Sequence, residues 1–161
     1  MRTRTLTTVA APLVAALGAV SIGTASAGTG NEQLTLITTT THGKPVYSVV
    51  ASGVFTAGGT ATAPTKGTIV LRFPTGTITL HNAKQHKTVT KTDTPTACQQ
   101  SLRSSGAYVV TGGTGAYSGV TGSGHVTMRA TFVERAVNGT CADTFDAAQA
   151  IITASGPLEL P

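Results

Sequence analysis

The stretch that decides the fold reads His125-Val126-Thr127-Met128-Arg129-Ala130-Thr131-Phe132. Apolar residues occupy every second position, and the positions between them carry polar or charged residues. Because successive side chains of a β-strand point to opposite faces, this alternation predicts a strand with one buried face. The residues predicted to face the interior are Val126, Met128, Ala130 and Phe132.

A similar alternation occurs earlier in the chain, on both sides of a turn. Thr68–Phe73 and Thr77–His81 are predicted strands, and Pro74-Thr75-Gly76 between them is typical of a tight turn. The pair therefore predicts a β-hairpin. We expect its inward residues to share one apolar space with the stretch above, and they include Ile69, Leu71 and Phe73.

Further short strands are indicated by frequent Thr, Val and Ile, by the 19 glycines and by the lack of long helical periodicity. The segments 57–66 and 93–103 are predicted loops, and residues 82–85 a predicted turn. Residues 147–150 could also open a short helix. These segments add up to about eight strands, each with one apolar face, and no helices are predicted to cover those faces. The strands must therefore bury their apolar faces against one another, which predicts an all-β protein that is closed as an antiparallel barrel or packed as a sandwich. The remaining predicted strands are Gln33–Thr40, Val46–Thr56, Lys87–Thr92, Gly106–Thr111 and Ala147–Ser155.

The first 27 residues are predicted to be an export signal. Arg2 and Arg4 precede an apolar run, and Ala25-Ser26-Ala27 matches the small-x-small pattern at which signal peptidase cuts. The run is too short and too rich in small residues for the ~20 apolar residues of a membrane span, and no Cys follows it to carry a lipid. We therefore expect a secreted protein without a membrane anchor, with a single domain over residues 28–161.

Charge and aromatic content argue against nucleic-acid binding. The region after residue 27 keeps nine of the eleven basic residues and all six acidic ones, so its net charge is +3. The lysines are scattered, there is no Trp, and aromatic residues make up 4% of the chain. A nucleic-acid interface needs a dense basic stripe with stacking aromatics. Solvated lysines explain this pattern, and weak attraction to anionic wall polymers or lipids is the alternative.

The two cysteines, Cys98 and Cys141, are predicted to form one disulfide. An even pair far apart in an exported chain most simply forms a bridge. A redox motif would need Cys-x-x-Cys, and a metal site would need more soft ligands nearby. We expect the bridge to tie the predicted 93–103 loop to the Asn138-Gly139-Thr140 turn.

The most distinctive segment, residues 112–124, reads Gly-Gly-Thr-Gly-Ala-Tyr-Ser-Gly-Val-Thr-Gly-Ser-Gly. Glycine permits positive φ and a tight reversal of the chain. Gly113, Gly115 and Gly119 are therefore predicted to form a structural turn. Tyr117 is predicted to lay its ring over that turn with its hydroxyl on a backbone partner, or alternatively to contact a ligand.

This segment resembles the Gly-Thr-Gly-x-Tyr-x-Gly motif of small secreted barrels similar to allene oxide cyclase and dirigent proteins, especially the exported members found in actinobacteria. The hairpin at Phe73–Thr79 and the ending Ser155-Gly156-Pro157-Leu158 match the same group. The resemblance implies an eight-stranded barrel with an apolar interior, which in the enzymes of the group shapes a reactive substrate. None of their polar catalytic residues belongs to the shared motif, so none is carried over.

No catalytic constellation stands out, and we predict no catalytic residues, no metal and no cofactor. The Gly-x-Ser-x-Gly elbow of hydrolases is absent. His81 and His86 bracket the predicted 82–85 turn, but a catalytic zinc needs a third protein ligand and neighbouring lysines would repel a cation. The six carboxylates lie mostly in predicted loops, strand ends or termini, which suits turn chemistry better than paired acid–base work.

Two classes of function remain, and the sequence leaves open whether the protein is an enzyme. The first is a non-enzymatic exported barrel that binds a small apolar molecule or serves as an envelope-associated module. The alternative is a cofactor-free cyclase or isomerase that works by holding a reactive chain in one conformation. The first is favoured, because export removes the protein from biosynthetic intermediates. The residues predicted to line the barrel or contact a ligand are Ile69, Leu71, Phe73, Tyr117, Val126, Met128 and Phe132.

Overall fold

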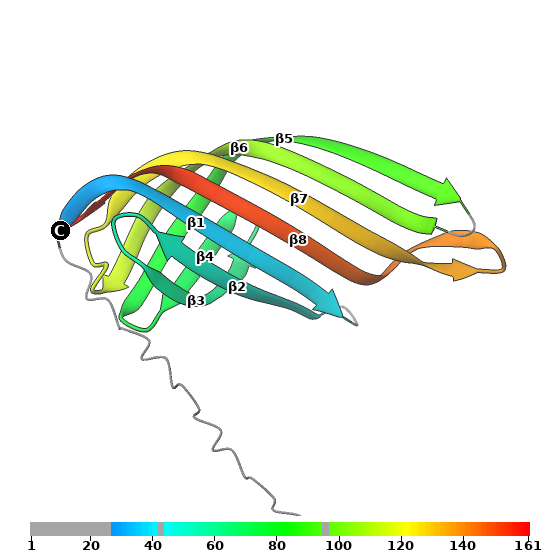
Figure 1. The fold of residues 1–161 in the computed structure, drawn as a ribbon, viewed down its shortest axis with the longest axis horizontal. Coiled ribbons are helices and arrows are strands. Elements are labelled where there is room, and N and C mark those ends of the chain that lie inside the picture. Colours follow the sequence, from blue (N-terminus) through cyan, green and yellow to red (C-terminus); the bar gives the residue numbers. More distant parts are fainter. Residues whose placement is uncertain (1–26, 42–43, 95–96) are drawn as a thin grey trace, which may run out of the picture.

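The computed structural model describes residues 27–41, 44–94 and 97–161, and it folds into one closed β-barrel (Figure 1). All neighbouring strands are antiparallel and follow one another in chain order, and β1 pairs with β8 to close the ring. The prediction of an all-β protein with an eight-stranded barrel is therefore confirmed. The strands are β1 (Gly28–Thr41), β2 (Lys44–Ser52), β3 (Ala57–Thr65), β4 (Thr68–Phe73), β5 (Gly76–Thr94), β6 (Ala97–Gly115), β7 (Thr121–Val137) and β8 (Thr140–Leu160).

The predicted export signal falls almost entirely on residues 1–26, which lie outside the described part of the chain. That segment stays a prediction. Within the described residues there is no helix long and apolar enough to cross a membrane.

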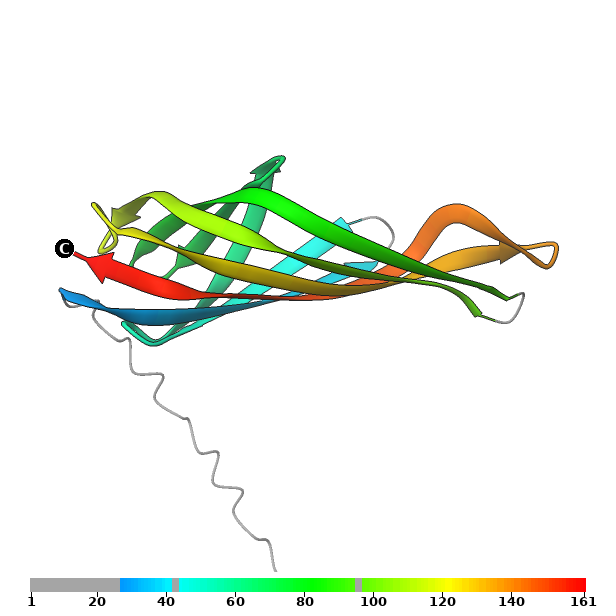
Figure 2. The same cartoon turned by 90° about the horizontal axis from the view of Figure 1, so that it is seen from above.

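The two ends of the barrel differ because the strands differ in length. Strands β2, β3 and β4 have 9, 9 and 6 residues, whereas β5 to β8 have 17 to 21. The long strands run on past the short ones as a curved sheet (Figure 2). We call this extension, residues 85–94, 97–105, 126–137 and 140–152, the arm. The barrel end that carries the arm is the open end, and the opposite end is the closed end.

The closed end is filled by a packed apolar core. Leu71 on β4 and Ile78 on β5 lie directly opposite each other, and both are 0% exposed. Burying a side chain of this size contributes about 1.5–3 kcal/mol, so this core supplies most of the hydrophobic stabilisation. Other members come from every strand and from the turns at this end, among them Leu34, Leu36, Val49, Phe55, Phe73, Tyr108, Val126, Ala154, Leu158 and Leu160.

Tyr117 closes this end of the barrel, where the β6–β7 turn folds over the core. Its ring is 1% exposed and packs on Phe55 and Phe73, with ring centroids 5.0 and 5.6 Å away. Its hydroxyl oxygen accepts a hydrogen bond from Thr75 Oγ1 at 3.2 Å, so the partner is a side chain and not the predicted backbone group. Tyr117 thus has a structural position in the core.

The glycines of this turn meet two different needs. Gly115 and Gly119 have positive φ, 63° and 83°, and the Ser118 N–H donates to the Gly115 carbonyl oxygen at 3.1 Å within the reversal. Gly113 differs, because it lies inside β6 and needs space instead of a positive φ. A Cβ at Gly113 would lie 2.2 Å from the carbonyl oxygen of Tyr117.

Three local predictions are wrong. The predicted loop at 57–66 is mostly strand β3, which is hidden in the sequence because only Ala61 on it is buried. The predicted turn at 82–85 is a register shift inside the continuous strand β5, and His81 and His86 therefore lie on one strand. The predicted 93–103 loop is largely the end of β5 and the start of β6. The segment 147–155 is strand, as predicted, within β8.

The predicted disulfide is confirmed. Cys98 and Cys141 are bridged with a Cα–Cα distance of 5.3 Å. Cys98 lies at the start of β6 and Cys141 at the start of β8, so the bridge links two strands that are not hydrogen-bonded neighbours, near the tip of the arm. It therefore ties two strands of the arm together, where a bridge between a loop and a turn was predicted.

Candidate ligand cavity at the open end

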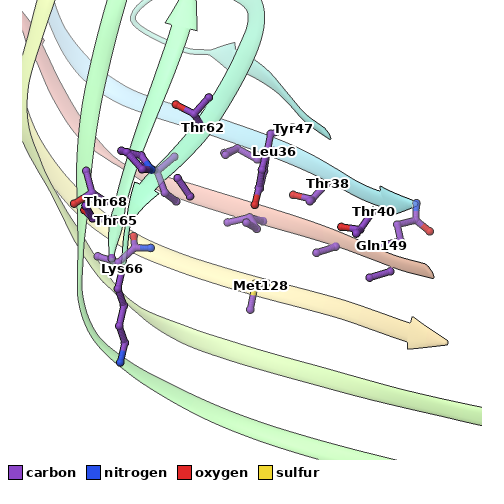
Figure 3. A pocket seen from close by; sticks show the side chains of 18 of the residues that line it. Leu36, Thr38, Thr40, Tyr47, Thr62, Thr65, Lys66, Thr68, Met128 and Gln149 are labelled. Carbon is purple, nitrogen blue, oxygen red and sulfur yellow. The ribbon is translucent and has the colours of Figure 1, made fainter. Parts of the chain in front are cut away.

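The interior changes from packed core to open cavity where the short strands end. A cavity of about 580 Å³ lies there, between β1, β2, the β3–β4 turn and the inner face of β7 and β8 (Figure 3). This volume is within the range of about 300–1,000 Å³ found for small-molecule sites. The cavity exists because β2, β3 and β4 stop while the strands facing them continue.

Alternation along each strand determines which side chains reach the cavity. On β7 the even-numbered residues face inward, so Met128 and Phe132 line the cavity, while Val126 belongs to the core and also lines the second hollow described below. On β4, Ile69 lines the cavity, whereas Leu71 and Phe73 are core residues. The single apolar space expected from the sequence is thus divided into a filled part and an open part. Further apolar lining comes from Leu36, Ala148, Ala150 and Ile152.

Polar groups on one side of the cavity could orient a ligand. Thr38 on β1 faces inward and is 8% exposed, and its Oγ1 has no hydrogen-bond partner within the described residues. Figure 3 shows Leu36, Thr38 and Thr40 in line along β1, with Tyr47 beside them and Lys66 extended from the β3–β4 turn. A buried hydroxyl without a partner costs free energy, which a ligand acceptor or donor would recover.

A second hollow of about 570 Å³ continues the cavity toward β5 and β6. The two share walls at Gly67, Met128 and Ile152. Lys66 and Lys87 bring positive charge to this side, and neither hollow has an Asp or Glu among its described lining residues. The site is therefore an apolar space with a cationic margin. The other polar lining residues of the second hollow are His81, Asn82, Gln85 and Ser104.

Two buried carboxyl groups, Glu32 and Glu134, were missed by the sequence analysis. Glu134 on β7 is 4% exposed and accepts a hydrogen bond from Gln100 Nε2. Glu32 on β1 is 1% exposed, and its Oε2 accepts a hydrogen bond from the Phe55 N–H at 3.2 Å. Burial raises the pKa of Glu32 above its ordinary value of 4.5, against the effect of the backbone hydrogen bonds around it. Burial, together with the charge of Glu32, also raises the pKa of Tyr108.

Glu32 holds the β2–β3 loop in place at the closed end and is not among the residues that line the cavity. Its signal was present in the sequence, because Glu32, Leu34, Leu36 and Thr38 alternate on one strand and share a face. That face is buried, so the polar residues at its two ends are buried with it. Lys66 carries no such signal, because a turn residue can point inward or outward.

Within the described residues, no group of three His, Cys, Asp or Glu side chains could hold a metal ion. His81 and His86 line different hollows. Compared with protein-family models, curated protein sequences and solved structures, the chain finds no match in any of the three. The resemblance to allene oxide cyclase and dirigent-like barrels therefore stays a prediction.

Proposed function

We propose that the protein is an exported barrel that binds a small, largely apolar molecule at its open end and does not transform it chemically. The observation that carries the proposal is the cavity of about 580 Å³ beside a fully packed core. A barrel evolved only as a structural module could fill its whole interior with side chains. Here the filling stops where Met128, Ile69 and Phe132 begin to line open space.

The polar margin of the cavity favours a ligand with an anionic end. Lys66 and Lys87 line the hollow that adjoins the apolar space, and no described carboxylate lines either hollow. A charged group left without a counter-ion is a natural partner for a ligand carboxylate, sulfonate or phosphate. The unpaired Thr38 hydroxyl adds one neutral hydrogen-bonding position.

The cyclase or isomerase alternative has less support. The titratable side chains that line the two hollows are Tyr47, Lys66, His81 and Lys87, and no described lining residue is a carboxylate that could act with them as an acid–base pair. The buried carboxyl group of Glu32 lies in the closed end beneath the β2–β3 loop. One of its oxygens is already engaged by the Phe55 N–H. What favours this alternative is the shape of the cavity, since positioning alone can accelerate an intramolecular reaction.

Two fluorescent probes of nearly the same shape test the proposal. N-phenyl-1-naphthylamine is neutral, and 1-anilinonaphthalene-8-sulfonate carries a sulfonate. We expect both to bind with one site per chain, and the sulfonate to bind about tenfold more tightly, since a hydrogen bond to a charged group contributes about 1.5 kcal/mol or more. Lys66→Gln should remove most of that difference.

Met128→Trp tests whether the probes occupy the cavity. The larger ring should weaken binding of both probes at least tenfold while the melting temperature stays close to that of the wild type, because open space accepts it. Val133→Trp is the matched control, since Val133 lies on the same strand but is 48% exposed on the outer face. If Met128→Trp instead destabilises the fold by about 1–3 kcal/mol and no probe binds, the space is a filled core and the proposal is wrong.

A further inference from the structure

Two arginines face each other on the outer surface of the arm. Arg103 on β6 and Arg129 on β7 are direct register partners, and both are exposed. They point away from the barrel, because their neighbours Ser104 and Met128 face inward and line the hollows described above. The pair therefore lies on the reverse side of the wall that encloses the cavity.

No carboxylate offsets this pair of charges. The strand segments around it, residues 84–92, 99–107, 121–133 and 147–155, contain no Asp or Glu. Within the described residues, neither arginine takes part in an ion pair, whereas Arg135 near the arm tip pairs with Asp146 at 2.8 Å. Like charges directly opposite each other on neighbouring strands destabilise a sheet. The arrangement therefore costs free energy unless something negatively charged binds there.

The arginines also line a hollow that contains further hydrogen-bond donors. It has a volume of about 270 Å³, and Thr88, Ser105 and Thr127 bring hydroxyl groups to it. The register places them in two rows across three strands. Ser105 lies opposite both His86 and Thr127, and in the next row Arg103 lies opposite both Thr88 and Arg129. His86, Arg103 and Arg129 are thus gathered on one outward patch with three hydroxyl groups.

We propose that this patch is an oxyanion site that takes a phosphate or sulfate group. Two guanidinium groups present forks of N–H donors that match a tetrahedral oxyanion with paired hydrogen bonds, and the hydroxyl groups can donate to the remaining oxygens. Binding would also cancel the repulsion between Arg103 and Arg129. The arginine, histidine and hydroxyl side chains of the site lie on the opposite face of the wall from the cavity, and Ser104 and Met128 border the hollows on both faces.

Phosphate titration followed by amide chemical shifts in two-dimensional NMR tests the site. Inorganic phosphate is added to the purified protein at constant ionic strength, with chloride as the balancing anion. We expect saturable shifts confined to residues 86–88, 103–105 and 127–129. Arg103→Gln and Arg129→Gln should each weaken binding at least tenfold. Arg72→Gln is the matched control, because it removes the same charged group from an exposed position on β4 that lines none of the three hollows, and it should leave phosphate binding unchanged.

Two further measurements keep the result unambiguous. In phosphate-free buffer Arg129→Gln should melt at a higher temperature than the wild type, since it relieves the repulsion, and phosphate should raise the melting temperature of the wild type alone. Titrating a short polyphosphate in parallel identifies the source: tighter binding of the polymer assigns the group to a polymer, and equal affinity assigns it to the free ion. The proposal is overturned if phosphate gives no saturable shifts, or if Arg72→Gln loses binding as much as the Arg103 and Arg129 variants do.

Discussion

Removing the disulfide is expected to cost the protein a large part of its stability, although the bridge lies outside the packed core. Cys98 and Cys141 are separated by 43 positions in the sequence. In the chain-entropy model, a closed loop of that length removes about 2.1 + 1.5R ln n cal/mol/K from the unfolded chain, or about 4 kcal/mol at 25 °C. Domains of this size typically have a total stability of about 5–15 kcal/mol.

The expected fall in melting temperature is roughly 10–20 °C, from the usual entropy of unfolding of a domain of this length. Thermal unfolding by circular dichroism, with and without a reductant, measures it on one protein. The reduced wild type loses the bridge but keeps both sulfur atoms, whereas Cys98→Ala/Cys141→Ala also loses the packing of Cys98, which is 7% exposed. We therefore expect the double variant to be slightly less stable than the reduced wild type.

A fall of this size requires that the arm unfolds together with the barrel. A melting temperature that falls by less than about 3 °C on reduction would refute it. In that case hydrogen exchange should show early loss of protection at residues 97–103 and 131–141 only, and the arm would be an independently opening unit. Intact protection in the core at Leu71 and Ile78 would separate this outcome from global unfolding.

The remaining predictions concern the closed end. Gly115→Val should destabilise the fold by about 1–3 kcal/mol or more, because Gly115 has φ 63° and a Cβ there would lie 2.3 Å from the Thr75 carbonyl oxygen. Gly58→Ala is the control in the same denaturant-unfolding series and should be neutral or stabilising, since a Cβ at Gly58 meets nothing within 4 Å. Glu32→Gln should change the dependence of stability on pH. Because the folded pKa of Glu32 is raised above 4.5, the wild type loses stability as pH rises from about that value through the folded pKa. The variant keeps an oxygen acceptor for the Phe55 N–H and should lack this loss. Urea unfolding of both proteins at pH 4.5 and 7.5 should therefore show that the stability of the wild type, relative to that of the variant, falls at the higher pH. The same difference between the two proteins at both pH values would contradict the raised pKa.

The strands that could be predicted are those whose two faces differ clearly. Residues 125–132 alternate apolar and polar side chains, and their inner face is buried or half-buried as that pattern requires. β3 could not be found in the same way, because Ala57–Thr65 offers one buried alanine and relies on backbone pairing with β2 and β4. On β5, the register shift between Asn82 and Gln85 places polar residues where a strand pattern would continue, and the sequence then looks like a turn.

The candidate site was only partly accessible to sequence reasoning. Alternation identified Met128, Phe132 and Ile69 as inward residues, but it could not tell which inward residues meet a partner and which meet open space. That depends on where β2, β3 and β4 stop relative to the strands opposite them. The Arg103–Arg129 pair was equally hidden, because it depends on the register of β6 against β7 across a turn whose length alone does not determine it.

The pairing of β1 with β8 has a consequence for how the molecule folds. Every other strand pairs with its neighbour along the chain through a local hairpin, whereas β1 must meet β8 along 14 positions, from Gly28 opposite Leu160 to Thr41 opposite Ala147. Contacts between distant parts of a chain form slowly, because the entropy of closing a long loop is lost before the contacts reward it. Ring closure is therefore expected to be the last and slowest step. Until it occurs, β1 and β8 each present a bare edge, and the wall that bounds the cavity stays open between these two strands.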